Sequence, residues 1–138
     1  MQIVVHSSSP GKRALVEVSA RFYEQELGLQ KSKYTLEIQF KKGLARREGM
    51  RGCVSDIAPK HLIMLLDSGL QDHALFETLA HEMIHVKQYA RGQFRIDRNK
   101  TIWLGKPLKL KYYQQPWEIE AMGKEKILAS KIYSIIWR

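Results

Sequence analysis

The sequence is poor in cysteine and has no long apolar run, and each scarcity excludes a class of protein. Cys53, the single cysteine, can form neither an intramolecular disulfide nor a thiolate metal cluster. The longest apolar runs, residues 62–66 and 3–5, are far shorter than the ~20 residues that cross a bilayer. The first residues do not resemble a secretory signal, and no repeat or low-complexity tract interrupts the chain. We therefore expect an intracellular protein with no membrane segment.

The composition is that of an ordinary globular domain. Apolar residues make up 44% of the 138 residues and charged residues 27%, which excludes disordered and fibrous classes. A chain of this length can bury one hydrophobic core but not two. We expect a single domain over residues 1–138.

The charge balance is strongly basic. Lysine and arginine outnumber aspartate and glutamate by 23 to 14, for a formal net charge of +9. Such an excess favours anionic surroundings, such as nucleic acid or acidic proteins, although charge runs are also typical of a plain solvated surface. The excess gathers in residues 91–111, with Arg91, Arg95, Arg98, Lys100, Lys106, Lys109 and Lys111 against Asp97, and in residues 41–51, with Lys41, Lys42, Arg46, Arg47 and Arg51 against Glu48.

Apolar periodicity and turn residues predict the order of the secondary structure. The predicted strands, which have β-branched or alternating apolar residues, are 2–6, 34–41, 50–57 and 61–67, the last two joined as a hairpin through Ala58-Pro59. The predicted helices are 12–27, 71–90 and a last one from Pro116 towards Trp137, with a basic loop over 91–115. This order predicts an α+β domain with an N-terminal helix and a three- to four-stranded mixed or antiparallel sheet.

The segment His81-Glu82-Met83-Ile84-His85 carries the H-E-x-x-H pattern in the middle of a predicted helix. Histidines four residues apart are neighbours on one helix face, so both imidazoles can reach one zinc ion. Glu82 lies about 100° round the helix, close enough to hold a water beside the metal. On a helical wheel the two histidines also lie apart from the apolar stripe of this helix, as residues that face a cleft would.

A catalytic zinc site needs a third protein ligand. His6, His61 and His73 have no ligand spacing, so Glu118 and Glu120 at the start of the last helix are the candidates. On a helical wheel with Glu120 at zero, the apolar residues of that helix span roughly 340° to 120°, and this arc is predicted to be buried. Its members are Trp117, Ala121, Ile127, Leu128, Ile132 and Ile135.

Glu120 falls inside this arc, where a carboxylate needs a partner, and we predict it as the third ligand. The other explanation for Glu120 is a buried salt bridge with Lys124. Glu118 falls outside the arc, and its position near the start of the helix suits a carboxylate that interacts with the helix dipole.

The H-E-x-x-H pattern, followed on a later helix by Glu120-Ala121, resembles the gluzincin metallopeptidases. The short chain and the strands before the motif are similar to the minimal SprT-like and IrrE-like members of bacteria and phages, over roughly residues 51–129. The resemblance implies a small zincin-like fold, Zn²⁺ bound by His81, His85 and Glu120, and Glu82 as general base. It also implies the cytoplasm of a bacterial or phage-infected cell as the location. Many members carry an aspartate four residues after the third ligand, where this chain has Lys124.

The resemblance implies hydrolysis of peptide bonds in a protein or peptide substrate. Gluzincins place the edge of the sheet that pairs with an extended substrate where residues 51–56 fall, so we expect Gly52, Cys53 and Val54 to contact the substrate. A hydrogen-bond donor for the developing oxyanion is also needed, and Tyr89, Tyr112 and Tyr113 are candidates among which the sequence does not choose.

A second hypothesis comes from a different class of protein. The chain could be a nucleic-acid- or protein-binding module in which zinc only holds the helices together, but such a site has no use for Glu82. The basic loop bears on both hypotheses. Its Arg95, Arg98, Lys100 and Lys106, with aromatic residues nearby, suit non-specific contact with DNA, and a solvated rim that selects acidic peptides is the competing interpretation.

Overall fold

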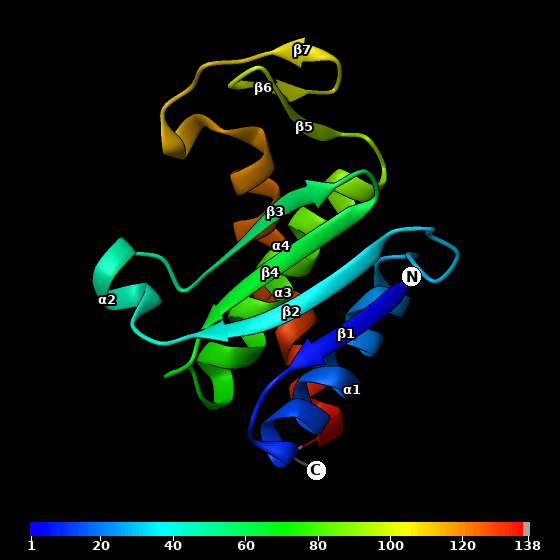
Figure 1. The fold of residues 1–138 in the computed structure, drawn as a ribbon, viewed down its shortest axis with the longest axis vertical. Coiled ribbons are helices and arrows are strands. Elements are labelled where there is room, and N and C mark those ends of the chain that lie inside the picture. Colours follow the sequence, from blue (N-terminus) through cyan, green and yellow to red (C-terminus); the bar gives the residue numbers. More distant parts are fainter. Residues whose placement is uncertain (137–138) are drawn as a thin grey trace.

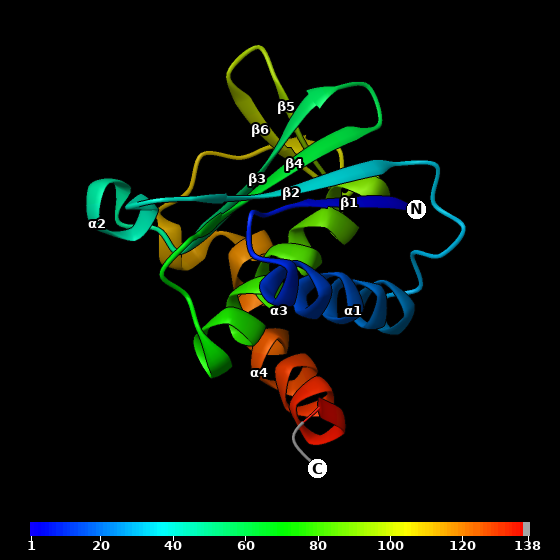
Figure 2. The same cartoon turned by 60° about the horizontal axis from the view of Figure 1, so that its bottom comes forward.

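The computed structural model describes residues 1–136, and its main feature is a four-stranded mixed sheet with helices on one face (Figures 1 and 2). The elements are β1 (Gln2–His6), α1 (Pro10–Glu26), β2 (Thr35–Lys41), α2 (Leu44–Glu48), β3 (Gly52–Ala58), β4 (His61–Asp67), α3 (Asp72–Ala90), β5 (Phe94–Asp97), β6 (Lys100–Trp103), β7 (Lys106–Pro107), the 3-10 helix η1 (Tyr112–Gln114) and α4 (Pro116–Ile136). The predicted α+β class and the N-terminal helix are confirmed. Trp137, the predicted end of the last helix, lies outside the described residues.

The order of strands in the main sheet is β1-β2-β4-β3. The first three are parallel, and β3 runs antiparallel to β4 in the predicted hairpin. In β2 and β4 alternate residues are buried, among them Leu36, Ile38, Leu62 and Met64, and they point towards the helices. β3 pairs with no other described strand on its outer side, so it is a free edge of the sheet beside α3.

One hydrophobic core fills the space between this sheet and helices α1, α3 and α4, which lie together on the same side of the sheet in Figure 2. Ser9 caps α1 by accepting a hydrogen bond from the Lys12 amide, and Pro10 occupies its first turn. The predicted apolar stripe of α3 is confirmed, because Leu75, Leu79 and Met83 are buried against the sheet. The histidine face of α3 is therefore turned away from the sheet core, towards α4.

The buried face of α4 differs from the one predicted. Ile127 and Ile135 were expected in the core, but their side chains are 61% and 52% exposed. The residues that pack inward are Trp117, Ala121, Leu128, Ala129 and Ile132. With Glu120 set at zero they span about 60° to 180° of the helix, so the true face is rotated away from Glu120 and towards Glu118.

The prediction of a basic loop after α3 is wrong for residues 94–107, because these residues form a second, three-stranded antiparallel sheet. Arg98 and Asn99 have φ angles of 50° and 66°, the left-handed values that a two-residue hairpin turn requires. Phe94 and Trp103 face each other across the hairpin and pack on Trp117, with ring centroids 5.3 Å and 6.0 Å from it. This small sheet lies beyond the end of β3 in Figure 1.

Within residues 1–136, no helix has the combination of length and apolar character that a membrane crossing needs.

The corrected face of α4 makes a direct stability prediction. We expect Leu128→Ala to lower the free energy of unfolding by about 2–5 kcal/mol, because it leaves a cavity in the core. Ile127→Ala, an equally drastic truncation one residue away, should change it by less than about 0.5 kcal/mol. Urea denaturation of both variants measures the difference, and equal losses would contradict the described packing.

A cluster on the solvent side of the sheet predicts a dependence of stability on pH. Glu37 accepts hydrogen bonds from His6 and His61, at 2.9 Å and 2.6 Å, and these bonds hold the pKa of Glu37 below its ordinary value. A lowered pKa stabilises the fold above the unfolded-state pKa of about 4.3, and this contribution is lost as the pH falls through the folded-state value. Glu37→Gln should therefore be less stable than the natural chain at pH 7, with the gap closing below about pH 4. A gap of constant size in denaturation curves between pH 7 and pH 3 would refute this.

Candidate metal centre

Helices α3 and α4, which pack against each other, bring together two histidines and one glutamate. His81 and His85 lie one turn apart on the side of α3 that faces α4, and Glu118 reaches them from the first turn of α4. All three side chains are half-buried. His81 and His85 are thus placed as the sequence predicts.

The ligand atoms form a small triangle. Glu118 Oε1 lies 2.9 Å from His81 Nε2 and 3.2 Å from His85 Nε2, and the two Nε2 atoms are 3.2 Å apart. Tetrahedral ligands at the usual zinc bond lengths of about 2.0–2.1 Å lie about 3.3 Å from one another. The group can therefore hold a metal ion, and its size fits zinc.

The other ring nitrogens of the two histidines are already engaged. His81 Nδ1 lies 3.1 Å from Glu125 Oε2, and His85 Nδ1 lies 2.8 Å from Gln88 Oε1. Because a carboxylate and an amide oxygen only accept hydrogen bonds, each Nδ1 carries the proton and donates it. In the neutral rings both Nε2 atoms are then bare acceptors that point at Glu118, an arrangement that a cation satisfies.

The electrostatics of the group favour positive charge at its centre. Burial alone would lower the pKa of His81 and of His85, but Glu118 and Glu82 outweigh it and raise both. Burial opposes ionisation of Glu118, yet once the imidazoles are protonated their Nε2–H groups donate to it, and these bonds lower its pKa to about 2. A bound metal ion would take the place of the protons that the imidazoles otherwise attract.

Glu82 lies beside this group without belonging to it. Its side chain is 5% exposed, and burial raises its pKa to about 7 against the opposing effect of His85 and His81. The backbone of β3 covers it closely, since a Cβ on Gly52 would lie 3.0 Å from Glu82 Cγ and 3.1 Å from Thr78 Cγ2. A side chain at position 52 would therefore crowd Glu82 and Thr78, which favours glycine where β3 approaches α3.

The prediction of Glu120 as third ligand is corrected by the structure. Glu120 points away from the histidines, and its Oε2 lies 2.6 Å from Lys87 Nζ and 2.9 Å from Lys124 Nζ. Burial opposes its ionisation, but the hydrogen bonds from Gln88, Lys87 and Lys124 lower its pKa to about 2. The alternative explanation, a salt bridge with Lys124, is present, and Glu118 is the glutamate that lies with the two histidines in the group that could hold a metal ion.

Glu120 is nevertheless connected to His85 through the side chain of Gln88. The Gln88 side chain is fully buried, and its Nε2 donates to Glu120 Oε1 at 2.8 Å and to the Trp117 carbonyl at 3.0 Å. These two bonds fix the orientation of the amide, so its oxygen must face His85. Gln88 and Glu125 therefore hold the rings of His85 and His81 in position, and neither role was predicted from the sequence. Gln88 follows His85 by three residues, and Glu125 shares a face of α4 with Glu118, which are the signals that could have indicated them.

Two cavities meet over Glu82 and form a groove along β3. The first, of about 320 Å³, is largely apolar and is called the aromatic cavity here; its walls include Val54, Tyr89, Phe94, Ile96 and Trp117. The second, of about 360 Å³, is called the polar cavity and is lined by Arg51, Glu77, Thr78 and Glu125, among others. Both include Met50, Gly52, His81, Glu82 and Tyr112. The predicted substrate contacts Gly52, Cys53 and Val54 line the aromatic cavity.

Of the three tyrosines considered, Tyr112 lies at the junction of the two cavities. Its hydroxyl donates to Glu118 Oε1 at 3.4 Å, and burial together with Glu118 raises its pKa. Tyr89 is buried in the wall of the aromatic cavity, and Tyr113 is 66% exposed and lines neither cavity. The basic residues Arg95, Arg98, Lys100 and Lys106 are exposed on the second sheet and its turns, and none lines either cavity.

Comparison with known proteins gives no match: no family model fits the chain, and no curated protein or solved structure matches it.

The reassignment of the third ligand has a direct test. Glu118→Gln should weaken zinc binding by more than about 100-fold, because it replaces a charged ligand atom with a neutral one. Glu120→Gln, the same change two residues away, should weaken it by less than about 10-fold, because Glu120 acts only through Gln88. Competition against a chromophoric chelator measures both affinities, and thermal unfolding checks that both variants fold. The reverse order would restore the prediction made from sequence.

Proposed function

We propose that the chain is a zinc-dependent metallopeptidase with a zincin-like fold, of the gluzincin type and related to the minimal SprT-like and IrrE-like proteins. One observation carries the proposal. Three ligand atoms converge on the floor of a groove, and a buried glutamate that is not a ligand lies beside them at the edge of the sheet. This combination fits hydrolysis by an activated water and has no purpose in a purely structural site.

Zinc is the metal that this ligand set fits best, because two imidazoles and one carboxylate with a further open position are typical of catalytic zinc sites. When bound, zinc supplies a Lewis acid that polarises a carbonyl group and makes water a stronger acid. His81, His85 and Glu118 would hold it, with Glu125 and Gln88 fixing the tautomers of the two histidines.

Glu82 handles the proton in this proposal. Its carboxylate accepts a proton from the attacking water and donates it to the nitrogen of the leaving amine. Burial suits it to this exchange, because a carboxyl group whose pKa is near neutrality can both take up and release a proton. Tyr112, which lies at the junction of the two cavities and donates to Glu118, is the tyrosine that we assign to stabilising the developing oxyanion.

The free edge of β3 binds the substrate in this proposal. An extended peptide that adds to this edge by backbone hydrogen bonds runs across Glu82, with side chains reaching the aromatic cavity on one side and the polar cavity on the other. The wall formed by Phe94, Ile96 and Trp117 suits an apolar side chain next to the bond that is cut.

The alternative, a binding module with a structural zinc site, is less well supported. Structural zinc sites are closed by four protein ligands, whereas among residues 1–136 the group contains three, all of which line the aromatic cavity. Cys53 lines the same cavity, yet it is not part of the group.

The proposed role of Glu82 predicts how its amide variant behaves. Glu82→Gln should lower kcat by at least about 100-fold, because the general base is lost while the shape of the side chain is kept. Zinc content should stay near that of the natural chain, since Glu82 is not a ligand. Zinc-loaded protein and a mixture of fluorogenic peptides supply the assay, and elemental analysis supplies the metal content.

Glu17→Gln, the same change on the exposed side of α1, is the matched control and should leave kcat unchanged. Full activity in Glu82→Gln would remove Glu82 from the mechanism. If the natural chain binds zinc but cuts no peptide, the peptidase proposal fails and the binding-module alternative is favoured.

A further inference from the structure

The polar cavity of the groove is acidic, although the chain as a whole is basic. Its acidic lining residues are Glu77, Glu82 and Glu125, against Arg51 and His81 on the basic side. The proposed hydrolysis uses Glu82, and Glu125 holds the ring of His81 through one of its two oxygens. Glu77 and the other oxygen of Glu125 have no part in it. The cavity therefore carries negative charge that the proposed chemistry does not need.

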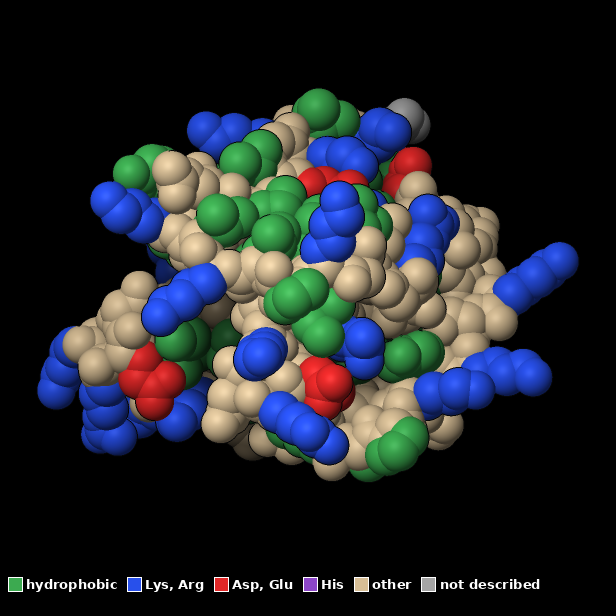
Figure 3. Space-filling view, turned by 90° about the horizontal axis from the view of Figure 1, so that it is seen from above, with side chains coloured by type: hydrophobic (Ala, Val, Ile, Leu, Met, Phe, Trp, Pro, Cys, Tyr) green, Lys and Arg blue, Asp and Glu red, His purple; other side chains and the backbone are tan. Residues whose placement is uncertain are grey.

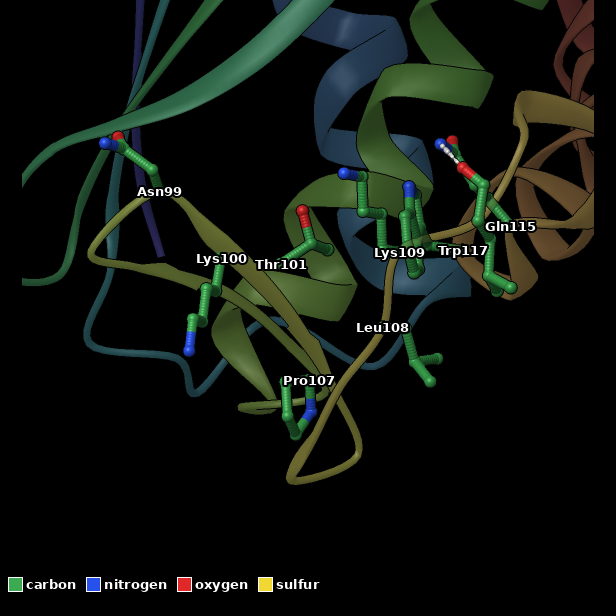
Figure 4. Close-up of a pocket in the computed structure, with 9 residues that line it drawn as sticks. Asn99, Lys100, Thr101, Pro107, Leu108, Lys109, Gln115 and Trp117 are labelled. Carbon is green, nitrogen blue, oxygen red and sulfur yellow. Dashed lines mark hydrogen bonds between the residues drawn. The ribbon is translucent and has the colours of Figure 1, made fainter.

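The neighbouring surface has the opposite charge. Figure 3, which views the end of the molecule that carries the second sheet, shows lysine and arginine side chains spread over the surface with few acidic ones between them. A separate cavity of about 530 Å³ lies under this sheet, and Figure 4 shows Lys100 and Lys109 on either side of it. The described residues that line it include no acid. Net charge thus draws anions to this protein, and a cation that binds in the groove must be held by local contacts.

Two polar side chains that line the polar cavity lack a hydrogen-bond partner in the described chain. Thr78 is only 6% exposed, and its hydroxyl makes no hydrogen bond within residues 1–136. Glu77 is half-buried, and its carboxylate makes neither a hydrogen bond nor an ion pair with any of these residues. Arg51 is exposed and pairs with neither Glu77 nor Glu125, although it lines the same cavity. Buried polar groups normally have partners, so a group that enters this cavity would supply them.

The lining selects the chemistry of the entering group. Carboxylates only accept hydrogen bonds and a hydroxyl can accept one, so the entering group should be a donor. An ammonium group offers three N–H bonds and a guanidinium group five, and both carry the positive charge that the carboxylates attract. A carboxylate from a substrate would be repelled by Glu77 and Glu125, and an apolar side chain would cover Glu77 without pairing with it. The volume of about 360 Å³ has room for a long side chain.

We propose that the polar cavity binds a lysine or arginine side chain of the substrate, with Glu77 as the residue that selects its charge. This inference rests on the proposed peptidase function, which places an extended substrate across Glu82 along the free edge of β3. The basic side chain enters the polar cavity while an apolar side chain of the same segment enters the aromatic cavity. The substrate class is therefore a peptide segment in which a basic and an apolar residue lie close together.

Peptide binding to the zinc-loaded Glu82→Gln protein tests the cavity without hydrolysis. The labelled peptides carry one phenylalanine and, at each of the two positions before and after it in turn, lysine, norleucine or glutamate. In fluorescence anisotropy, lysine in at least one of these positions should bind about tenfold or more tighter than norleucine, and glutamate should bind most weakly.

Two further substitutions in the same protein assign this preference to a residue. Adding Glu77→Gln should reduce the preference for lysine to less than about threefold, because the amide keeps the shape of the side chain and loses its charge. Adding Glu17→Gln, the same change on the exposed side of α1, is the matched control and should leave the preference intact.

Four results would overturn the proposal: no binding of any peptide, equal binding of the lysine and norleucine peptides, a preference for glutamate, or a lysine preference that Glu77→Gln leaves unchanged. Hydrolysis by the zinc-loaded natural chain separates this outcome from that of the peptidase proposal. If lysine is preferred in binding but no peptide is cut, the peptidase proposal fails and the cation-binding cavity stands. If peptides are cut and lysine is not preferred, the cavity proposal fails and the peptidase stands.

Discussion

The packing of α4 against α3 is the contact on which the candidate metal centre depends. α4 buries Trp117, Ala121, Leu128 and Ile132, and this choice of face turns Glu118 towards the histidines of α3. Glu125, two turns further along the same face, meets the other nitrogen of His81. The apolar residues of one helix therefore decide which carboxylate reaches the metal site, and any change in the rotation of α4 would separate the ligands.

A second layer of polar contacts holds this arrangement in place. Gln88 is fully buried and joins His85 to Glu120 and to the backbone of α4, while Lys87 and Lys124 neutralise Glu120. Buried polar groups of this kind are costly unless each has a partner, so the network strongly favours one relative position of the two helices. The edge strand β3 also packs on α3, and Gly52 leaves little room between its backbone and Glu82. The candidate ligands, Glu82 and the sheet edge are thus positioned by one set of contacts around α3.

The sequence predicted most of the fold because strong periodicity determines it. The four strands of the main sheet and the three long helices were identified to within a few residues, and His81, Glu82 and His85 lie as their spacing predicts. The structure groups Glu118, and not the predicted Glu120, with the histidines, and Glu120 was favoured because Ile127 was counted as buried, which extended the inferred face of α4 across Glu120. The hairpin of β5 and β6 was missed because its charges outweighed the alternation of Phe94, Ile96, Thr101 and Trp103. Its turn of Arg98 and Asn99 also lacks the glycine that usually marks such hairpins.

X-ray absorption spectroscopy of the zinc-loaded protein tests the central claim most directly, because it reports the atoms around the metal. The account predicts one zinc ion per chain, with two imidazole nitrogens and one carboxylate oxygen from the protein at about 2.0–2.1 Å, and a further oxygen from exchangeable water. Failure to bind zinc, a sulfur ligand from Cys53, or four protein ligands that close the site would each contradict it.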